Sequence, residues 1–403
     1  MRPFLAMSLA AAVFAAAAPG VAASQSAAAA PRARDLGIPF PGVPGRYNAI
    51  TDVAGIEVGQ TTLVRGEGTL RQGKGPVRTG VTTIHPLGRK GLDAVAAGFA
   101  VINGTGEFTG TRVIEELGLL IGPIALTGTG NIPVVDQAML DWAARPGYLP
   151  PDQRFLRVGP VIGETLDSHL NDVLGHPMTE QDVFSALDDA KGGPVAEGNV
   201  GGGTGMQAYE FKGGIGTASR VVRIGDRTYT VGVLVQANNG RREDLRVAGI
   251  PVGQIITTQM PEEPGVQPAT TRTDKNSLLI VIATDAPLQP HQLNRLARRA
   301  ALGVGRNGST ARNTSGEFAL AFSTTNRSPI SGRAPSYEQI SDLDGVLMND
   351  LFTATVEATE EAIVNQLVAS ETMVGANGYK VYGIPHERLV EVLRAHSMIN
   401  AGH

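Results

Sequence analysis

The 403-residue chain carries 34 Lys and Arg against 38 Asp and Glu, and 42% of its residues are hydrophobic. This balance excludes a disordered protein, and it gives no basic surface for binding nucleic acid or an anionic membrane. The sequence contains no cysteine, which excludes thiol catalysis, thiolate metal sites and disulfide bonds.

The first predicted element is a secretory signal peptide over residues 1–23. Arg2 supplies its positive charge, residues 4–18 its apolar region and residues 21–23 a small-residue cleavage site, although cleavage as late as residue 30 fits as well. We therefore expect a periplasmic or secreted protein. No later segment offers about 18 consecutive apolar residues, so we expect no membrane span in the mature chain.

Strands and helices are mixed along the rest of the chain. Apolar runs that end in Gly, Asn or Thr predict strands, and apolar residues repeated every three or four positions predict helices. In chain order, the expected strands are 80–88, 94–104, 122–130, 156–164, 229–240, 277–287 and 317–324, and the expected helices are 111–120, 131–144, 291–305 and 347–369. Residues 260–276 contain three prolines and almost no apolar periodicity, which predicts an exposed loop.

Common catalytic signatures are missing from the sequence. It has no G-x-S-x-G elbow, no S-x-x-K arrangement at Ser277 and no H-E-x-x-H. Its seven histidines never fall at a metal-ligand spacing, so we expect no metal or other cofactor. The Gly-rich segments 102–110, 126–133 and 198–214 lack the phosphate-binding signatures, and we interpret them as turns or as backbone walls of a site.

The expected strand near residue 317 carries a polar pair on one face. Because side chains alternate along a strand, Phe318 and Phe322 share one face, whereas Ser315 and Glu317 share the other face with two alanines. A strand face open to solvent usually carries polar residues along its whole length. A solvated face and a face turned toward a site are therefore both compatible with this pattern.

A serine stands where the exposed loop gives way to a buried strand, at Asn276-Ser277. If the bond between them is cut, the Ser277 hydroxyl and a free α-amine of pKa about 7.7–8.0 lie within a few atoms of each other. Such a residue supplies its own base. The serine can perform the cut itself through an N-to-O acyl shift, although the Asn-Ser dipeptide alone is a weak signal.

Six separated blocks resemble one family over nearly the whole mature chain: NAITDVAGIEVG, NGTGEFTGT, GNVGGGTGM, VGVLVQANNGRREDLRVAGIPVG, NSLLIVIATDAPLQPHQLNRLARRAALGVGRNGS and TSGEFALAFST. They are similar to the self-cleaving aminopeptidases that include L-aminopeptidase/D-esterases and β-peptidyl aminopeptidases. The resemblance implies an αββα sandwich, as in N-terminal-nucleophile hydrolases. It also implies an α chain of residues 24–276 and a β chain of residues 277–403, which form one domain and assemble as a tetramer of αβ heterodimers.

The resemblance also assigns roles to individual residues. It implies Ser277 as nucleophile, with Ser315 and Glu317 in support, and Asn238 as the oxyanion-hole donor. Asn239 is the alternative for this donor. It further implies that Glu164 binds the free amine of a small peptide or amide substrate, and that Phe155 lines the substrate pocket, where an ordinary core phenylalanine is an equal alternative.

Leu166 departs from part of the family. Members that favour α-amino substrates carry a tyrosine two residues after the amine-binding glutamate, and a leucine leaves room for the extra methylene of a β-amino acid. The resemblance therefore favours an exported β-peptidyl aminopeptidase. The alternatives are an L-aminopeptidase/D-amino-acid amidase-esterase of the same family and a non-catalytic periplasmic binding protein. An acetyltransferase of the same fold type is less consistent, because those enzymes generate an N-terminal threonine.

Overall fold

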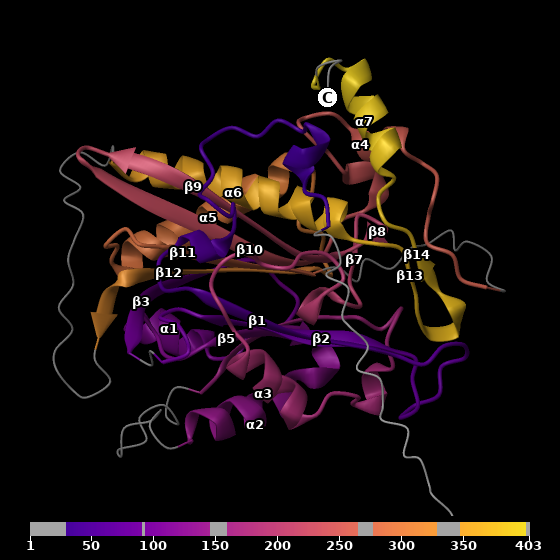
Figure 1. Ribbon diagram of the computed structural model, residues 1–403, viewed down its shortest axis with the longest axis horizontal. Helices are drawn as coiled ribbons and strands as arrows, with labels where there is room; N and C mark the ends of the chain where they lie inside the picture. The colour runs from indigo at the N-terminus through magenta and orange to yellow at the C-terminus, as the bar shows by residue number, and fades with distance from the viewer. Residues whose placement is uncertain (1–29, 91–92, 146–158, 265–276, 329–346, 400–403) are drawn as a thin grey trace, which may run out of the picture.

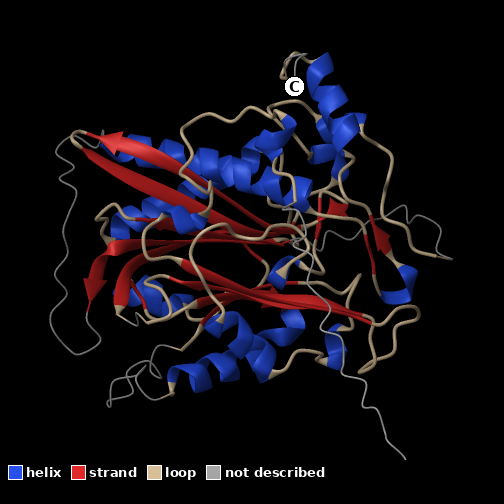
Figure 2. Ribbon diagram, viewed as in Figure 1, coloured by secondary structure: helices blue, strands red, loops and turns tan. Residues whose placement is uncertain are grey.

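The computed structural model describes residues 30–90, 93–145, 159–264, 277–328 and 347–399. The expected signal peptide, Phe155 and Asn276 lie outside these residues. The described chain forms four layers, in which helices cover the outer faces of two stacked sheets (Figure 1). Figure 2 shows the strands in the two central layers and the long helices outside them.

The larger sheet has six strands. β11 (Ser277–Thr284) lies in its interior, parallel to β12 and antiparallel to β10. The strand order is β4 (Leu119–Leu120), β3 (Ala94–Gly104), β12 (Gly316–Ser328), β11, β10 (Arg227–Asn238) and β9 (Gly214–Ile224).

The smaller sheet has four strands, and its last two strands run parallel. The strand order is β1 (Glu57–Arg65), β2 (Val77–His85), β5 (Ile124–Gly128) and β6 (Val161–Thr165). Two short hairpins complete the described strands: β7 (Gln207–Ala208) with β8 (Phe211–Lys212), and β13 (Met373–Val374) with β14 (Lys380–Val381).

The helices complete the outer layers. The larger sheet is covered by α5 (Pro290–Arg306) and α6 (Leu347–Ala369), and the smaller sheet by α2 (Ile132–Ala143) and α3 (Glu180–Asp188). The remaining α-helices are α1 (Thr111–Leu117), α4 (Val252–Ile255) and α7 (His386–Ala395). No helix of the described residues combines the length and apolar character that crossing a bilayer requires.

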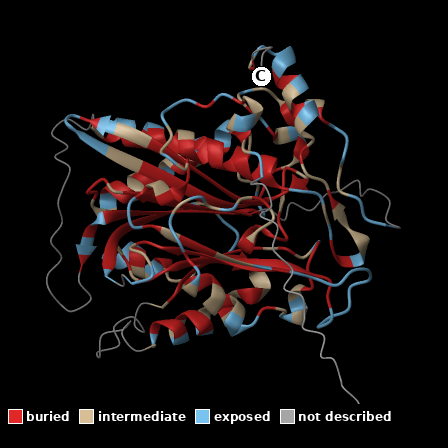
Figure 3. Cartoon of the chain, viewed as in Figure 1, coloured by how far each residue is buried: buried red, intermediate tan, exposed pale blue. Residues whose placement is uncertain are grey.

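Three apolar cores separate the layers. One lies between the larger sheet and its helices, one between the two sheets, and one between the smaller sheet and α2 with α3. The sheets and α6 are buried along most of their length (Figure 3). Strand alternation explains the first two cores, because Leu278 and Ile280 enter the helix-side core whereas Leu279 and Val281 enter the inter-sheet core.

Most predicted elements are confirmed, and β3 and α6 have the predicted bounds. Two strands of the larger sheet were not predicted. The expected helix 111–120 ends at Leu117, and its last two residues form the short strand β4 instead. The other unpredicted strand is β9. Its sequence interrupts the apolar pattern with Thr217, Ser219 and Arg220, all of which are buried. Their polar atoms are paired: the Arg220 guanidinium, for example, lies 2.7 Å from the Glu361 carboxylate on α6. Residues that look solvated in the sequence are thus part of a buried polar network.

Candidate active site

Ser277 begins β11 at one end of the larger sheet. Its Cα pairs with that of Asn238, the last residue of β10, and with that of Gly316, the first residue of β12. The C-terminal end of β3 reaches the same point, because Gly104 pairs with Gly316. Four neighbouring strands therefore bring their ends together around a buried serine.

Strand alternation separates the groups around Ser277 onto two faces of the sheet. The Ser277 side chain has the parity of Leu279, which enters the inter-sheet core, so it points between the sheets. Glu317 stands beside Leu278 and has the parity of Ala319, which enters the helix-side core. The backbone nitrogen of Ser277 lies in the plane between the two faces.

The Asn238 side chain belongs to the inter-sheet face. Two residues earlier, Gln236 on the same face donates hydrogen bonds to the Thr127 carbonyl and the Thr165 hydroxyl of the smaller sheet. The Asn238 Oδ1 accepts from the Gln207 backbone N–H at 2.8 Å, and its Nδ2 donates to the Leu166 carbonyl at 3.0 Å. A primary amide has a second N–H in addition to the one that binds Leu166, and Asn238 is the strand partner of Ser277.

Alternation gives the neighbouring Asn239 the opposite direction. Ala237, with the same parity, belongs to the helix-side core, and Asn239 is fully buried. The Asn239 backbone carbonyl accepts from the Tyr209 N–H at 2.6 Å. Of the two candidate donors, only Asn238 shares the face of the Ser277 side chain.

Ser315 and Glu317 form a buried pair, as strand parity predicted. The Ser315 hydroxyl donates to Oε1 of Glu317, and Oε2 has no hydrogen-bond partner among the described residues. Burial raises the pKa of the Glu317 carboxyl to about 7, although the Ser315 hydrogen bond opposes this shift. A carboxyl group with this pKa can exchange a proton near neutral pH.

Glu164 lies at the end of β6 in the smaller sheet. Its Oε2 accepts from the Thr129 hydroxyl, and its Oε1 accepts from the Glu107 backbone N–H at 3.1 Å. Burial raises the pKa of the Glu164 carboxyl, and these two hydrogen bonds lower it. The buried carboxylate has no cation beside it among the described residues.

Gly106 connects the Glu164 carboxylate to the end of the larger sheet. A Cβ built on Gly106 would lie 3.5 Å from Oε1 of Glu164 and 3.4 Å from Cα of Gly316. Because Gly316 is paired with Ser277, the carboxylate and the serine face the same small region from two sheets. Gly106 and Thr129 belong to Gly-rich segments that we interpreted as turns or walls, but their contact with Glu164 was not predicted.

Leu166 lies directly after β6, with its side chain partly buried. Since its carbonyl accepts from Asn238, the backbone at this position is held beside the end of β10. The position of Phe155 relative to this region cannot be given, because that residue is outside the described part of the chain. The other predicted site residues in the described chain come together at the same end of the two sheets.

A buried lysine next to the site was not predicted either. Lys212 is fully buried on β8, and its ammonium donates to the carbonyls of Gly203 and Gly213 at 3.2 and 2.6 Å. Burial lowers its pKa to about 7. Within the residues that the structure describes, no group of three or more His, Asp or Glu side chains is arranged to hold a metal ion.

A known protein family and known proteins match most of the chain. The model of peptidase family S58 matches residues 48–381. The beta-peptidyl aminopeptidase BapA of Sphingosinicella xenopeptidilytica is 62% identical over 377 residues, which cover 93% of each chain.

Solved structures extend the comparison to the fold. One similar structure is the L-aminopeptidase D-Ala-esterase/amidase of Ochrobactrum anthropi, described as a prototype of serine aminopeptidases with a variant of the Ntn hydrolase fold. It superposes with a TM-score of 0.82 at 45% identity, and the match covers 92% of this chain and 100% of that chain. A beta-aminopeptidase of Burkholderia sp. has a TM-score of 0.78 and 42% identity, covering 90% of this chain and 98% of that chain. The expected αββα fold of N-terminal-nucleophile hydrolases is thereby confirmed.

Proposed function

The chain belongs to peptidase family S58, and we propose that it is a β-peptidyl aminopeptidase that cleaves its own Asn276–Ser277 bond and then uses Ser277 as nucleophile. Membership of a peptidase family favours an enzyme over the non-catalytic binding protein. The observation that carries the proposal is the pairing of Ser277, at the start of a strand, with Asn238 on one side and Gly316 on the other.

The groups around Ser277 support a complete acyl-transfer cycle. The α-amine takes the proton of the Ser277 hydroxyl as Oγ attacks the substrate carbonyl, and the free N–H of Asn238 donates to the developing oxyanion. The C–N bond then breaks, and the leaving amine takes the proton from the α-ammonium. Water, deprotonated by the same amine, hydrolyses the acyl ester and regenerates Ser277.

Glu317 acts on the amine rather than on the hydroxyl. Its side chain and that of Ser277 point to opposite faces of the sheet, with the Ser277 nitrogen between them. A carboxylate in this position stabilises the ammonium form that appears during each cycle. Ser315, which donates to Glu317, holds the carboxylate in place.

Glu164 accounts for cleavage at an amino terminus. Among the residues that the structure describes, its buried carboxylate has hydrogen-bond donors but no cationic partner, so a substrate ammonium completes the pair. A peptide without a free terminal amine lacks this charge. The distance between Glu164 and Ser277 then fixes which carbonyl reaches the nucleophile.

A β-amino acid is proposed as the released residue, for two reasons. The relative at 62% identity is named a beta-peptidyl aminopeptidase. In addition, Leu166 is smaller than the tyrosine found there in family members that favour α-amino acids. The alternative is the L-aminopeptidase and amidase-esterase activity of the same family, named for the Ochrobactrum anthropi structure.

Processing, assembly and location complete the proposal. We propose that residues 24–276 and 277–403 form the α and β chains of one domain, that four αβ units assemble into a tetramer, and that the signal sequence directs export. The fold is compatible with cleavage of the Asn276–Ser277 bond. β11 pairs with β10 on one side and with β12 on the other, so it stays in the sheet after cleavage.

The substrate proposal is tested with two p-nitroanilides that share a side chain and differ by the backbone methylene. We expect kcat/KM to be higher for the β-homo substrate than for the α-amino substrate, and Leu166→Tyr to shift that ratio toward the α-amino substrate. The N-acetylated β-homo compound is the control, since it has no ammonium. A wild-type preference for the α-amino substrate would assign the alternative activity.

A further inference from the structure

A buried carboxylate close to Glu164 takes no part in the mechanism above. Asp167 lies three residues after Glu164 and one after Leu166, and only 1% of it is exposed. Its Oδ2 accepts from the Thr79 hydroxyl at 2.6 Å. Among the residues that the structure describes, no salt bridge joins Asp167 to a cation. A buried carboxylate without a counter-charge destabilises the fold unless a bound cation compensates it.

One short segment contacts both carboxylates. Thr129 donates its hydroxyl to Oε2 of Glu164. The preceding residue, Gly128, is packed against Asp167, because a Cβ built on Gly128 would lie 2.4 Å from Oδ2 of Asp167. Consecutive Cα atoms are about 3.8 Å apart, so the two carboxylates contact neighbouring points of this segment.

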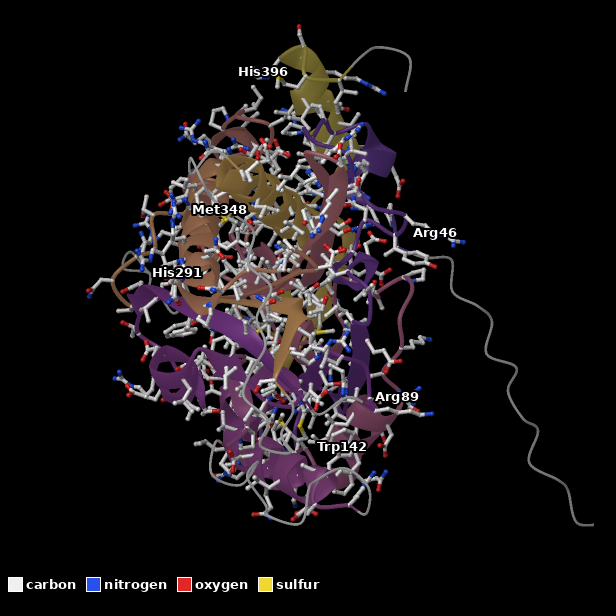
Figure 4. All side chains as sticks on the ribbon, turned by 90° about the vertical axis from the view of Figure 1, so that its left-hand side faces the viewer. Arg46, Arg89, Trp142, His291, Met348 and His396 are labelled. Atoms are coloured by element: carbon white, nitrogen blue, oxygen red, sulfur yellow. The ribbon has the colours of Figure 1, made fainter. Side chains whose placement is uncertain are left out.

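This segment is fixed from both ends. It follows β5 and leads into α2, whose Trp142 is buried in the core beside the smaller sheet (Figure 4). Within it, the Asn131 side-chain amide donates to the hydroxyls of Thr79 and Thr127 at 2.9 and 3.1 Å. Because Thr79 is also the donor to Asp167, hydrogen bonds hold this carboxylate to the segment that binds Glu164.

The two carboxyl groups also interact electrostatically. Burial raises the pKa of the Asp167 carboxyl to about 6, hydrogen bonds from Thr79 and Asn171 oppose this shift, and the charge of Glu164 adds to it. Asp167 is therefore ionised at pH 8. Like charges in this arrangement repel each other, and a cation bound at Glu164 is attracted by both carboxylates.

We propose that Asp167 strengthens the binding of the substrate ammonium at Glu164, as a positioning residue that does not touch the substrate. The inference rests on the proposed function, in which Glu164 binds that ammonium. Three residues of chain span at most about 10 Å, which we take as the distance over which the Asp167 charge acts. Over this distance a unit charge changes a binding constant about 2-fold at the dielectric constant of water and about 16-fold at a value of about 20.

The test compares processed wild type with Asp167→Asn at pH 8. It uses the p-nitroanilide of β-homoalanine as substrate, and the analogue with a hydroxyl in place of the amine as a neutral competitive inhibitor. Asp167→Asn should raise KM for the amine by about 2- to 16-fold, and it should leave kcat and the inhibition constant of the hydroxyl analogue unchanged. A substitution that only disturbed the shape of the site would weaken the binding of both compounds. Processing into two chains involves no substrate ammonium and should proceed as in wild type.

Asp172→Asn is the matched control. Asp172 is also buried, five residues further along the chain, and its Oδ2 accepts from the Gly75 N–H at 3.1 Å. This variant should leave KM for the amine unchanged. Melting temperature verifies that each variant folds, and Asp167→Ser removes the same charge in a smaller volume if Asp167→Asn does not fold.

The outcomes separate this inference from the proposed function. An unchanged KM in Asp167→Asn, or an equal loss of binding for the hydroxyl analogue, would overturn the role of Asp167 while Glu164 keeps its own. Normal turnover of the amine substrate by Glu164→Gln would overturn the proposed ammonium site, and this inference with it.

Discussion

Replacement of Glu317 by Gln tests how the Ser277 amine is held. Leu278 is the strand neighbour of Glu317, so the backbones that carry the carboxylate and the Ser277 nitrogen are about one strand spacing apart, roughly 5 Å, which we take as the separation of the two charges. The carboxylate stabilises the ammonium and raises its pKa. The substitution removes this charge with little change of shape, so the pKa of the amine should fall.

The size of the change follows from the separation. Two unit charges about 5 Å apart interact by about 3 kcal/mol at an effective dielectric constant of about 20, which corresponds to about 2 in pKa. Burial raises the pKa of the Glu317 carboxyl to about 7, so near neutral pH the carboxylate is only partly ionised and the two groups titrate as a pair. We therefore expect a fall of about 1 to 2 in the amine pKa.

The assay is the pH dependence of kcat/KM for processed wild type and Glu317→Gln, prepared by co-expression of the two chains if the precursor does not cleave itself. Because the amine must be neutral to accept a proton, the acid limb reports its pKa, and its midpoint should move to lower pH while the maximum rate falls. Glu391→Gln, exposed on α7, is the control. An acid limb that stays in place with full activity would refute the reasoning and point to another base.

Three further predictions concern amine binding, the oxyanion and stability. Glu164→Gln should still process itself but lose aminopeptidase activity on peptides with a free amine, because the substrate ammonium then enters a desolvated site without a counter-charge. Normal turnover of these peptides would show that Glu164 does not bind the ammonium. Asn238→Ala should lower kcat by about 100- to 1,000-fold with little change in substrate binding, and a change confined to KM would contradict its role as oxyanion donor. His85 packs against Trp142, and burial lowers its pKa from 6.5 to about 4, so it contributes stability that is present above pH 6.5 and lost as the pH falls to about 4. Urea titration at pH 7 and at pH 4 gives the difference in unfolding free energy between the two pH values. His85→Leu should reduce this difference by about 3 kcal/mol. An unchanged difference would show that His85 is not the group that titrates.

Local sequence patterns predicted much of the fold. Apolar runs located β3 and β11, both faces of which are buried. Apolar residues repeated every three or four positions located α5 and α6. The same parity predicted the shared face of Ser315 and Glu317. These predictions depend only on the geometry of one strand or one helix.

The site depends on relations between elements, which local patterns do not contain. The contrast between Asn238 and Asn239 follows from the pairing of β10 with β11, and the approach of Glu164 to the larger sheet follows from Gly106 between them. Without the resemblance to a family, the choice of Glu164 among 38 acidic residues could not have been predicted.

The most direct test of the central claim, that Ser277 becomes an N-terminal nucleophile, is the intact mass and N-terminal sequence of the purified enzyme. We expect two chains, with the smaller beginning SLLIV, whereas Ser277→Ala should remain a single chain without activity. An active wild-type enzyme that consists of one uncut chain, or a second chain that begins at any other residue, would contradict the account.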